Sequence, residues 1–154
     1  MAKILIIDDE RGIRNTLREI LEDEGYDAEV AENGKQGLQM AFQQTYDLIY
    51  SDIKMPEMDG IEVLSAIKST GEYANQDTPI ASLETPIVMI TGHGDVETAV
   101  QALKLGAYDF LQKPLDLNRR LITTKNALES KQLRQETKQL RKKVAAKGPQ
   151  MIGE

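Results

Sequence analysis

Three aspartates stand at positions where a bound metal and a phosphoryl group could be handled together. Asp8 and Asp9 directly follow the apolar run 3–7, and Asp52 directly follows the run 46–51. Carboxylates that converge on one place repel one another, and a hard divalent cation such as Mg²⁺ relieves this repulsion. A carboxylate is also a nucleophile that can carry a phosphoryl group. We therefore interpret Asp52 as a phosphoryl acceptor working with Mg²⁺; the alternative for any single aspartate is a helix cap or a solvated side chain.

Two hydrogen-bond donors follow further apolar runs. Thr91 comes directly after residues 86–90, and Lys113 comes two residues after the run 108–111. The Lys113 ammonium can pair with Asp52 or with a group attached to it, and the Thr91 hydroxyl is a second donor. In phosphoryl transfer a protein mainly positions groups and neutralises charge, so a carboxylate, a metal and these two donors are suitable parts.

The apolar runs before these residues predict β-strands. Short continuous apolar runs are typical of strands buried on both faces of a parallel sheet. The predicted strands cover residues 3–7, 26–30, 46–51, 86–90 and 108–111. Ligands of open parallel sheets bind beyond the carboxyl ends of the strands, which is where the candidate residues lie.

Helical spacing of apolar residues follows each predicted strand. The residues expected to face inward are Ile13, Leu17, Ile20 and Leu21; Leu38, Ala41 and Phe42; Val63, Leu64 and Ile67; and Val96, Ala99, Val100 and Leu103. The expected caps and stops are Gly25, Asn33, Asp95, Gly106 and Asp116. The last helix is expected to extend to about Lys147. The alternation predicts an α/β fold, a five-stranded parallel sheet with helices on both faces and an extended C-terminal helix.

Composition excludes several classes of protein. The 154 residues contain no cysteine and a single histidine, His93, so disulfide frameworks and multi-histidine zinc sites are excluded. No apolar run is long enough for a signal peptide or a membrane span, and we expect a cytoplasmic protein with no membrane partner. Residues 1–130 hold 12 Lys and Arg against 23 Asp and Glu, which argues against nucleic-acid binding. The basic residues 131–154 are interpreted as a solvated helix face, with nucleic-acid contact as the alternative.

Four motifs, in this order, resemble the receiver domain of bacterial two-component response regulators. They are IIDDE at 6–10, SDIKMPEMDG at 51–60, ITGH at 90–93 and KP at 113–114. The resemblance covers residues 1–130, and it implies a flavodoxin-like (CheY-like) fold with strand order 2-1-3-4-5. It also implies that a sensor histidine kinase is the partner that phosphorylates Asp52.

The same resemblance implies a role for each site residue. Asp9 and Asp52 are expected to bind Mg²⁺ directly, Asp8 directly or through water, and the main-chain carbonyl of Lys54 to complete the protein ligands. Lys113 is expected to contact the phosphoryl group, with a cis bond to the following proline.

A switch is also implied by the resemblance, in which Thr91 turns toward the phosphoryl group and Phe110 moves inward behind it. Lys54 and His93 flank the site, and neither carries a carboxylate or carboxamide that could orient an attacking water. We therefore predict a phosphoacceptor with at most slow autodephosphorylation rather than an enzyme. His93 itself is interpreted as an exposed loop residue.

Residues 89–119 resemble a narrower group, the NtrC-type, sigma-54-dependent transcription activators. In this interpretation residues 1–130 are the receiver, 131–147 a linker or signalling helix, and 148–154 the start of an AAA+ ATPase domain that the chain does not carry. That domain is then a partner in the full-length protein. A broken heptad is compatible with a coiled-coil homodimer, and the alternative is a single amphipathic helix that needs the partner domain; the heptad residues are Leu121, Leu128, Leu133, Leu140 and Val144.

Two points remain open from the sequence. Residues 69–85 form an insertion relative to the resembled family, for which a surface loop is expected and no role is assigned. The alternative function is a pseudo-receiver, a protein-interaction module that works without phosphorylation. A flavodoxin or a haloacid-dehalogenase-type phosphatase is disfavoured, because Asp8 to Glu10 would repel a flavin phosphate and Lys54 stands where the phosphatase needs an aspartate.

Overall fold

Five short strands form one parallel sheet in the computed structural model, which describes residues 2–68, 85–92, 96–113 and 118–129. The strands are β1 (Lys3–Ile7), β2 (Asp27–Ala31), β3 (Leu48–Asp52), β4 (Ile87–Thr91) and β5 (Asp109–Gln112). Their order is β2-β1-β3-β4-β5, as predicted. Every residue of β3 and β4 is buried, which explains why these strands read as continuous apolar runs.

The polar residues at the strand ends belong to the strands themselves. β3 and β4 were expected to end at residues 51 and 90, yet Asp52 pairs with Ile90 in the ladder and Thr91 pairs with Gln112. The backbone hydrogen bonds of a ladder do not depend on side-chain polarity, so hydrophobicity alone placed these two boundaries one residue early.

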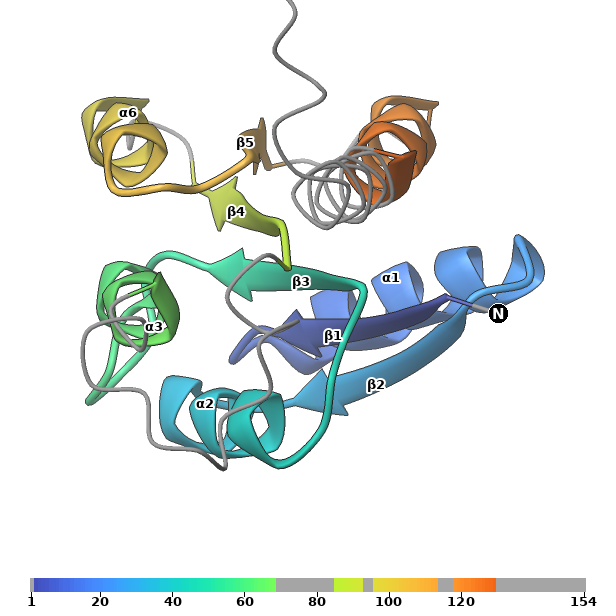
Figure 1. Ribbon diagram of the computed structural model, residues 1–154, viewed down its shortest axis with the longest axis horizontal. Helices are drawn as coiled ribbons and strands as arrows, with labels where there is room; N and C mark the ends of the chain where they lie inside the picture. The colour runs from blue at the N-terminus through green and yellow to red at the C-terminus, as the bar shows by residue number, and fades with distance from the viewer. Residues whose placement is uncertain (1, 69–84, 93–95, 114–117, 130–154) are drawn as a thin grey trace, which may run out of the picture.

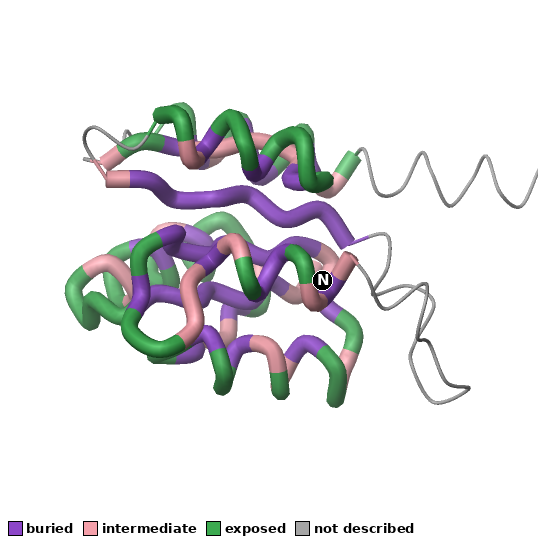
Figure 2. The backbone as a smooth tube through the Cα atoms, turned by 90° about the vertical axis from the view of Figure 1, so that its left-hand side faces the viewer, coloured by how far each residue is buried: buried purple, intermediate pink, exposed green. Residues whose placement is uncertain are grey.

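Helices cover both faces of the sheet (Figure 1). Helices α2 (Gly34–Gln43), α3 (Gly60–Lys68) and α6 (Val96–Lys104) pack on one face, and α1 (Arg11–Asp23) and the helix 118–129 on the other. Each face has its own apolar core. The tube in Figure 2 is buried along the central strands, and it alternates between buried and exposed along the helices. The predicted α/β fold is confirmed.

Two predicted helix ends are confirmed by their hydrogen bonds. Asn33 caps α2, because its Oδ1 accepts from the Gln36 N–H at 2.7 Å. Gly25 follows α1 with a φ of +91°, a left-handed conformation that favours glycine. Its N–H donates to the Glu22 carbonyl at 3.0 Å and satisfies one of the open carbonyls at the end of the helix.

The inward face predicted for α6 was wrong in part. Ala99 is buried as expected, but Val96, Val100 and Leu103 are 46%, 42% and 37% exposed, and Ala102 is buried in their place. The two alanines let the helix lie close to the sheet, and the larger side chains are left on its flanks. Phe42 of α2, also expected inward, is 37% exposed.

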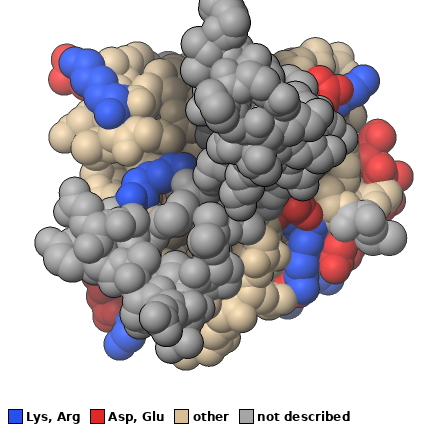
Figure 3. All heavy atoms as spheres, in the orientation of Figure 1, with Lys and Arg blue, Asp and Glu red and all other residues tan. Residues whose placement is uncertain are grey.

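Several expectations lie outside the described residues. They concern most of the insertion 69–85, His93, the Asp95 and Asp116 caps, the Lys113–Pro114 bond, and residues 130–154 with the linker helix and the start of a further domain. Thr85 is described, and its hydroxyl donates to the Tyr46 carbonyl at 2.8 Å. On the face seen in Figure 3, acidic and basic side chains are intermixed along both flanks. No helix in the described ranges is long and apolar enough to cross a membrane.

Candidate functional site

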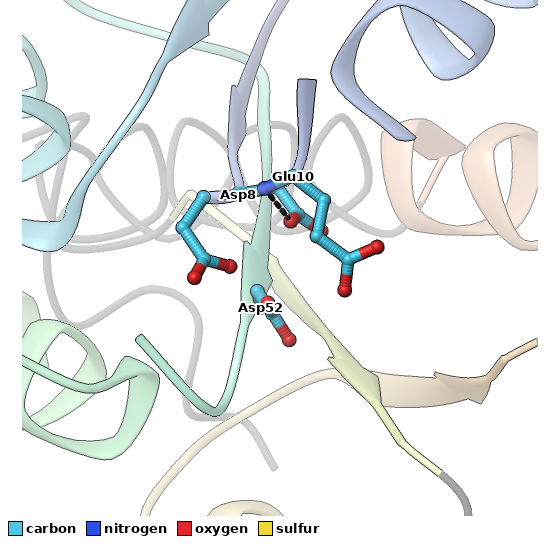
Figure 4. A group of neighbouring side chains, drawn as sticks. Asp8, Glu10 and Asp52 are labelled. Atoms are coloured by element: carbon cyan, nitrogen blue, oxygen red, sulfur yellow. Dashed lines mark hydrogen bonds between the residues drawn. The ribbon is translucent and has the colours of Figure 1, made fainter. Parts of the chain in front are cut away.

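The strand register brings the acidic residues of β1 and β3 together. Ile7 pairs with Ser51, so Asp8 and Asp52, the next residues along these parallel strands, lie at the same edge of the sheet. One carboxylate oxygen from each of Asp8, Asp9, Glu10 and Asp52 lies within 4.8 Å of the others. Figure 4 shows Asp8 and Glu10 beside Asp52. The three aspartates predicted to cluster therefore do so, and Glu10 joins them.

Asp8 is fully buried and held in place through its backbone and one carboxylate oxygen. Its N–H donates to the Ala31 carbonyl at 3.2 Å, and its own carbonyl accepts from Arg14 at 2.7 Å. Oδ1 accepts from the Glu10 N–H at 2.8 Å, the bond dashed in Figure 4. Within the described residues, Oδ2 has no hydrogen-bond partner although it is buried. A buried carboxylate oxygen without a donor is a position that a cation can fill.

The pKa values of the two buried carboxyl groups, Asp8 and Asp52, lie above their ordinary values. Burial, and after it the neighbouring Asp8 carboxylate, raises the pKa of Asp52 to about 7, although Lys113 opposes the shift. Burial also raises the pKa of Asp8 above its ordinary value, while the Glu10 backbone N–H and Lys113 act in the opposite direction. Ionising both buried carboxyl groups at once is thus unfavourable unless positive charge is added to the site.

Lys113 provides part of that positive charge. Its Nζ lies 3.0 Å from Glu10 Oε1, 3.5 Å from Asp52 Oδ2 and 3.8 Å from Asp8 Oδ2. Its backbone N–H donates to the Thr91 carbonyl at 2.8 Å, which fixes the end of β5 against β4. Burial alone would lower the pKa of Lys113, but the hydrogen bond to Glu10 and the charges of the aspartates raise it. The predicted pairing of Lys113 with Asp52 is confirmed as an ion pair.

Glu10 is a site residue that the sequence placed after the first strand, in the motif IIDDE, but to which it assigned no role. It follows Asp9, and its contact with Lys113 joins positions 103 residues apart. One signal was present in the sequence: glutamate is not among the residues favoured at a helix N-cap, and Glu10 stands directly before α1.

Thr91 and Phe110 lie on the strands β4 and β5, and no hydrogen bond given by the described residues joins either side chain to the carboxylates. Thr91 is fully buried at the end of β4, and its hydroxyl donates to the Gly92 carbonyl at 3.1 Å. Phe110 is partly buried on β5, opposite Met89. Lys54, two residues after Asp52, is exposed. The roles predicted for these three residues stay predictions.

The turn after β3 packs tightly against Asp52. The Gly60 N–H donates to the Ile53 carbonyl at 2.8 Å, which folds the segment 53–60 back on itself. A Cβ at Gly60 would overlap the Asp52 carbonyl oxygen and would lie 2.8 Å from the Met89 Cε. Only glycine fits there, and this close approach explains the glycine at the end of the motif SDIKMPEMDG.

The donor set suits a small, hard cation. Carboxylate oxygens are the protein ligands that Mg²⁺ prefers, and it retains several waters, so one or two direct carboxylates suffice. Asp9 and Asp52 could supply these, with the open Oδ2 of Asp8 beside them. Asp52 is then a nucleophile that shares a carboxylate cluster suited to a cation and lies 3.5 Å from the Lys113 ammonium, which is an arrangement for phosphoryl transfer.

Comparison with known proteins agrees with this chemistry. The family model named "Response regulator receiver domain" matches residues 4–125 of this chain. The nitrogen assimilation regulatory protein NtrX of Azorhizobium caulinodans is 41% identical over 140 residues, covering 90% of this chain and 28% of that protein. The regulatory protein AtoC of Escherichia coli is 33% identical over 138 residues, covering 90% and 28%. The chain thus spans less than a third of the length of these curated relatives.

Solved structures share the fold. The crystal structure of the receiver domain of NtrX from Brucella abortus superposes with a TM-score of 0.71 at 36% identity, covering 82% of this chain and 98% of that one. A longer crystal structure of NtrX from the same organism gives a TM-score of 0.79 at 36% identity, covering 92% and 30%.

Proposed function

The chain belongs to the response regulator receiver domain family, and from this premise we propose that it is a phosphorylation-dependent switch in which Asp52 accepts a phosphoryl group from a sensor histidine kinase. One observation carries the assignment of Asp52. Its buried carboxylate lies 3.5 Å from the Lys113 ammonium, at the same sheet edge as Asp8, whose buried Oδ2 accepts no hydrogen bond from the described residues.

In the transfer step an Asp52 carboxylate oxygen attacks the phosphorus of a phosphohistidine. The new O–P bond forms as the P–N bond breaks, and the imidazole nitrogen of the kinase keeps the bonding electron pair. The product is an acyl phosphate on Asp52. Lys113 stays beside the transferred group and offsets its added negative charge. Asp52 must be ionised to attack, and its pKa of about 7 means that positive charge in the site also favours the reactive form.

Mg²⁺ is proposed as the cofactor, held by Asp9 and Asp52, by Asp8 directly or through water, and by the main-chain carbonyl of Lys54. When bound, it would neutralise the phosphoryl oxygens and the carboxylates together. The carboxylate donor set and the raised pKa values of Asp8 and Asp52 support this proposal.

The switch proposed for this chain uses Thr91 and Phe110. The Thr91 hydroxyl donates to a neighbouring carbonyl at 3.1 Å, and a phosphoryl oxygen on Asp52 would be a stronger acceptor at the adjoining strand end. When Thr91 turns toward that oxygen, Phe110 moves inward behind it. The signal thereby passes from β3 across β4 to the edge strand β5.

The output of the switch is proposed to be a sigma-54-activating AAA+ ATPase with a DNA-binding output, joined through residues 131–147 in the full-length protein. NtrX and AtoC are both named as regulatory proteins, and the chain covers only 28% of each. We propose a cytoplasmic homodimer, no membrane partner, no nucleic-acid binding by this chain, and an aspartyl phosphate that decays slowly without an enzyme.

Labelling with acetyl phosphate tests the proposed acceptor. Wild type is expected to gain one phosphoryl group in Mg²⁺, detected by intact mass, and Asp52→Asn is expected to gain none. Asp23→Asn, which removes an exposed carboxylate at the end of α1, is the matched control and should label as wild type does. Chelating Mg²⁺ should abolish labelling, and sedimentation with and without the label measures the dimer.

Full labelling of Asp52→Asn would overturn the acceptor assignment. Failure of wild type to label or to bind beryllofluoride in Mg²⁺ would favour the phosphorylation-independent interaction module instead.

A further inference from the structure

Glu10 stands directly before helix α1, but its side chain does not cap the helix. It is the N-cap of α1, with φ −93° and ψ 115°, and its side chain makes no capping hydrogen bond. Only its carbonyl takes part in the helix, accepting from the Arg14 N–H at 3.1 Å. An N-cap is usually a Ser, Thr, Asp or Asn, whose short side chain reaches the open N–H groups. The longer glutamate instead reaches across the site.

The Glu10 carboxylate takes the shortest contact of Lys113. Its Oε1 lies 3.0 Å from Nζ and accepts a hydrogen bond, whereas Asp52 Oδ2 and Asp8 Oδ2 lie 3.5 Å and 3.8 Å away, at ion-pair distance only. Side-chain exposure shows the same order: Glu10 is 59% exposed, while Asp52 is 4% and Asp8 0%. The ammonium is therefore drawn toward the solvent side of the site and away from the acceptor.

We propose that Glu10 is a positioning residue that holds Lys113 in the unphosphorylated site and competes with the phosphoryl group for it. The inference rests on the proposed function of Asp52, because it concerns how Lys113 reaches a group on that residue. A phosphoryl group brings close to two negative charges and several acceptor oxygens. On its arrival Lys113 shifts inward and the contact with Glu10 breaks.

The contact weakens phosphoryl binding by a modest factor. Glu10 is more than half exposed, and ion pairs of this kind change equilibria by about two- to fivefold. Removing the contact frees Lys113, so binding of a phosphoryl analogue becomes tighter by that factor.

Two substitutions separate the effect of the Glu10–Lys113 contact from the effect of the negative charge of Glu10. Glu10→Gln removes the charge and weakens the contact. Glu10→Asp keeps the charge, but its side chain is shorter and suits the open N–H groups of α1, so it turns away from Lys113. Glu32→Gln is the matched control, because Glu32 is an exposed glutamate that follows β2 at the same edge of the sheet. The probe is beryllofluoride in saturating Mg²⁺, with the dissociation constant measured by calorimetry.

Both Glu10 variants are expected to bind beryllofluoride about two- to fivefold more tightly than wild type, with Glu32→Gln unchanged. In a crystal structure of the wild-type complex, Lys113 Nζ should contact the beryllofluoride and lie beyond hydrogen-bond distance of Glu10. Tighter binding by Glu10→Gln alone would reveal a through-space charge effect and overturn the inference. Weaker or unchanged binding by both variants, or a Lys113–Glu10 bond retained in the complex, would also overturn it. If wild type does not bind at all, the proposed function itself fails.

Discussion

A phosphoryl group on Asp52 is lost to water at a rate that the neighbouring side chains decide. Lys54, two residues further along, is exposed and ends in an ammonium, which cannot orient a water for attack as a carboxylate or carboxamide can. The half-life of the label should therefore be long. Lys54→Asn should shorten it by on the order of tenfold, which is less than the rate factor that a fully positioned general acid or base contributes. Intact mass against time after removal of acetyl phosphate measures the decay.

Lys35→Asn is the matched control for this prediction, since Lys35 is an exposed lysine on α2. It should leave the decay unchanged. A wild-type label lost within seconds would contradict the prediction.

The acceptor cluster could be predicted at the scale of single residues because strand ends converge in a parallel sheet. That rule placed Asp8, Asp52 and Lys113 at one edge, where the structure has them. It could not place the Glu10 side chain, because the rotamer that reaches Lys113 depends on where β5 ends relative to α1. The roles expected for Thr91 and Phe110 came from the family resemblance and concern a phosphorylated state.

The helix 118–129 is attached to the acceptor strand β3 through a buried tyrosine. The Tyr50 hydroxyl lies 2.5 Å from Thr124 Oγ1, and Thr124 in turn donates to the Arg120 carbonyl at 2.8 Å. Both side chains are fully buried, and burial raises the pKa of Tyr50 to about 12. The contact joins the strand that ends in Asp52 to the helix that leads toward residue 130.

Removing this hydroxyl should destabilise the protein by about 1 kcal/mol. In Tyr50→Phe the ring still fills the core and Thr124 still donates to the Arg120 carbonyl. Only the contacts of the Tyr50 hydroxyl are lost, with Thr124 and, at 3.3 Å, with the Arg120 carbonyl. Urea unfolding measures the change. Tyr26→Phe is the matched control, because Tyr26 packs on the same core and is only partly buried. An equal effect of the two substitutions would show that the Tyr50 hydroxyl contributes nothing specific.

At the scale of elements, periodicity predicted which segments are helices better than which face they bury. On α6 the branched residues Val96 and Val100 define the apolar stripe in the sequence, yet Ala99 and Ala102 make the buried contact. Alanine contributes little to a hydrophobic pattern, but it permits the closest approach of a helix to a sheet. The strand positions were correct to within two residues. The remaining differences arise because backbone hydrogen bonding, and not hydrophobicity, sets where a strand ends.

The whole molecule is a sheet with an apolar core on each face, and the apolar pattern predicted this layering. The order of the strands did not follow from that pattern. Continuous apolar strands indicate burial on both faces but fit several orders, and the order 2-1-3-4-5 came from the resemblance to receivers. Burying carboxylates at the sheet edge costs free energy, and this cost also belongs to the scale of the whole molecule because it lowers the free energy of unfolding of the entire fold.

That cost predicts how the stability of the metal-free protein depends on pH. In the folded protein Asp52 holds its proton up to about pH 7, whereas in the unfolded chain it releases the proton near its ordinary value of 3.8. Between these values unfolding releases a proton, so the free energy of unfolding falls as the pH rises. Asp52→Asn stays neutral and avoids this loss. Its free energy of unfolding should exceed that of wild type by about 4 kcal/mol at pH 8 and by about 2 kcal/mol at pH 5. Urea unfolding in the presence of a chelator measures the free energy of unfolding of both proteins. Added Mg²⁺ should stabilise wild type more than the variant. Parallel pH profiles of the two proteins would contradict the raised pKa of Asp52.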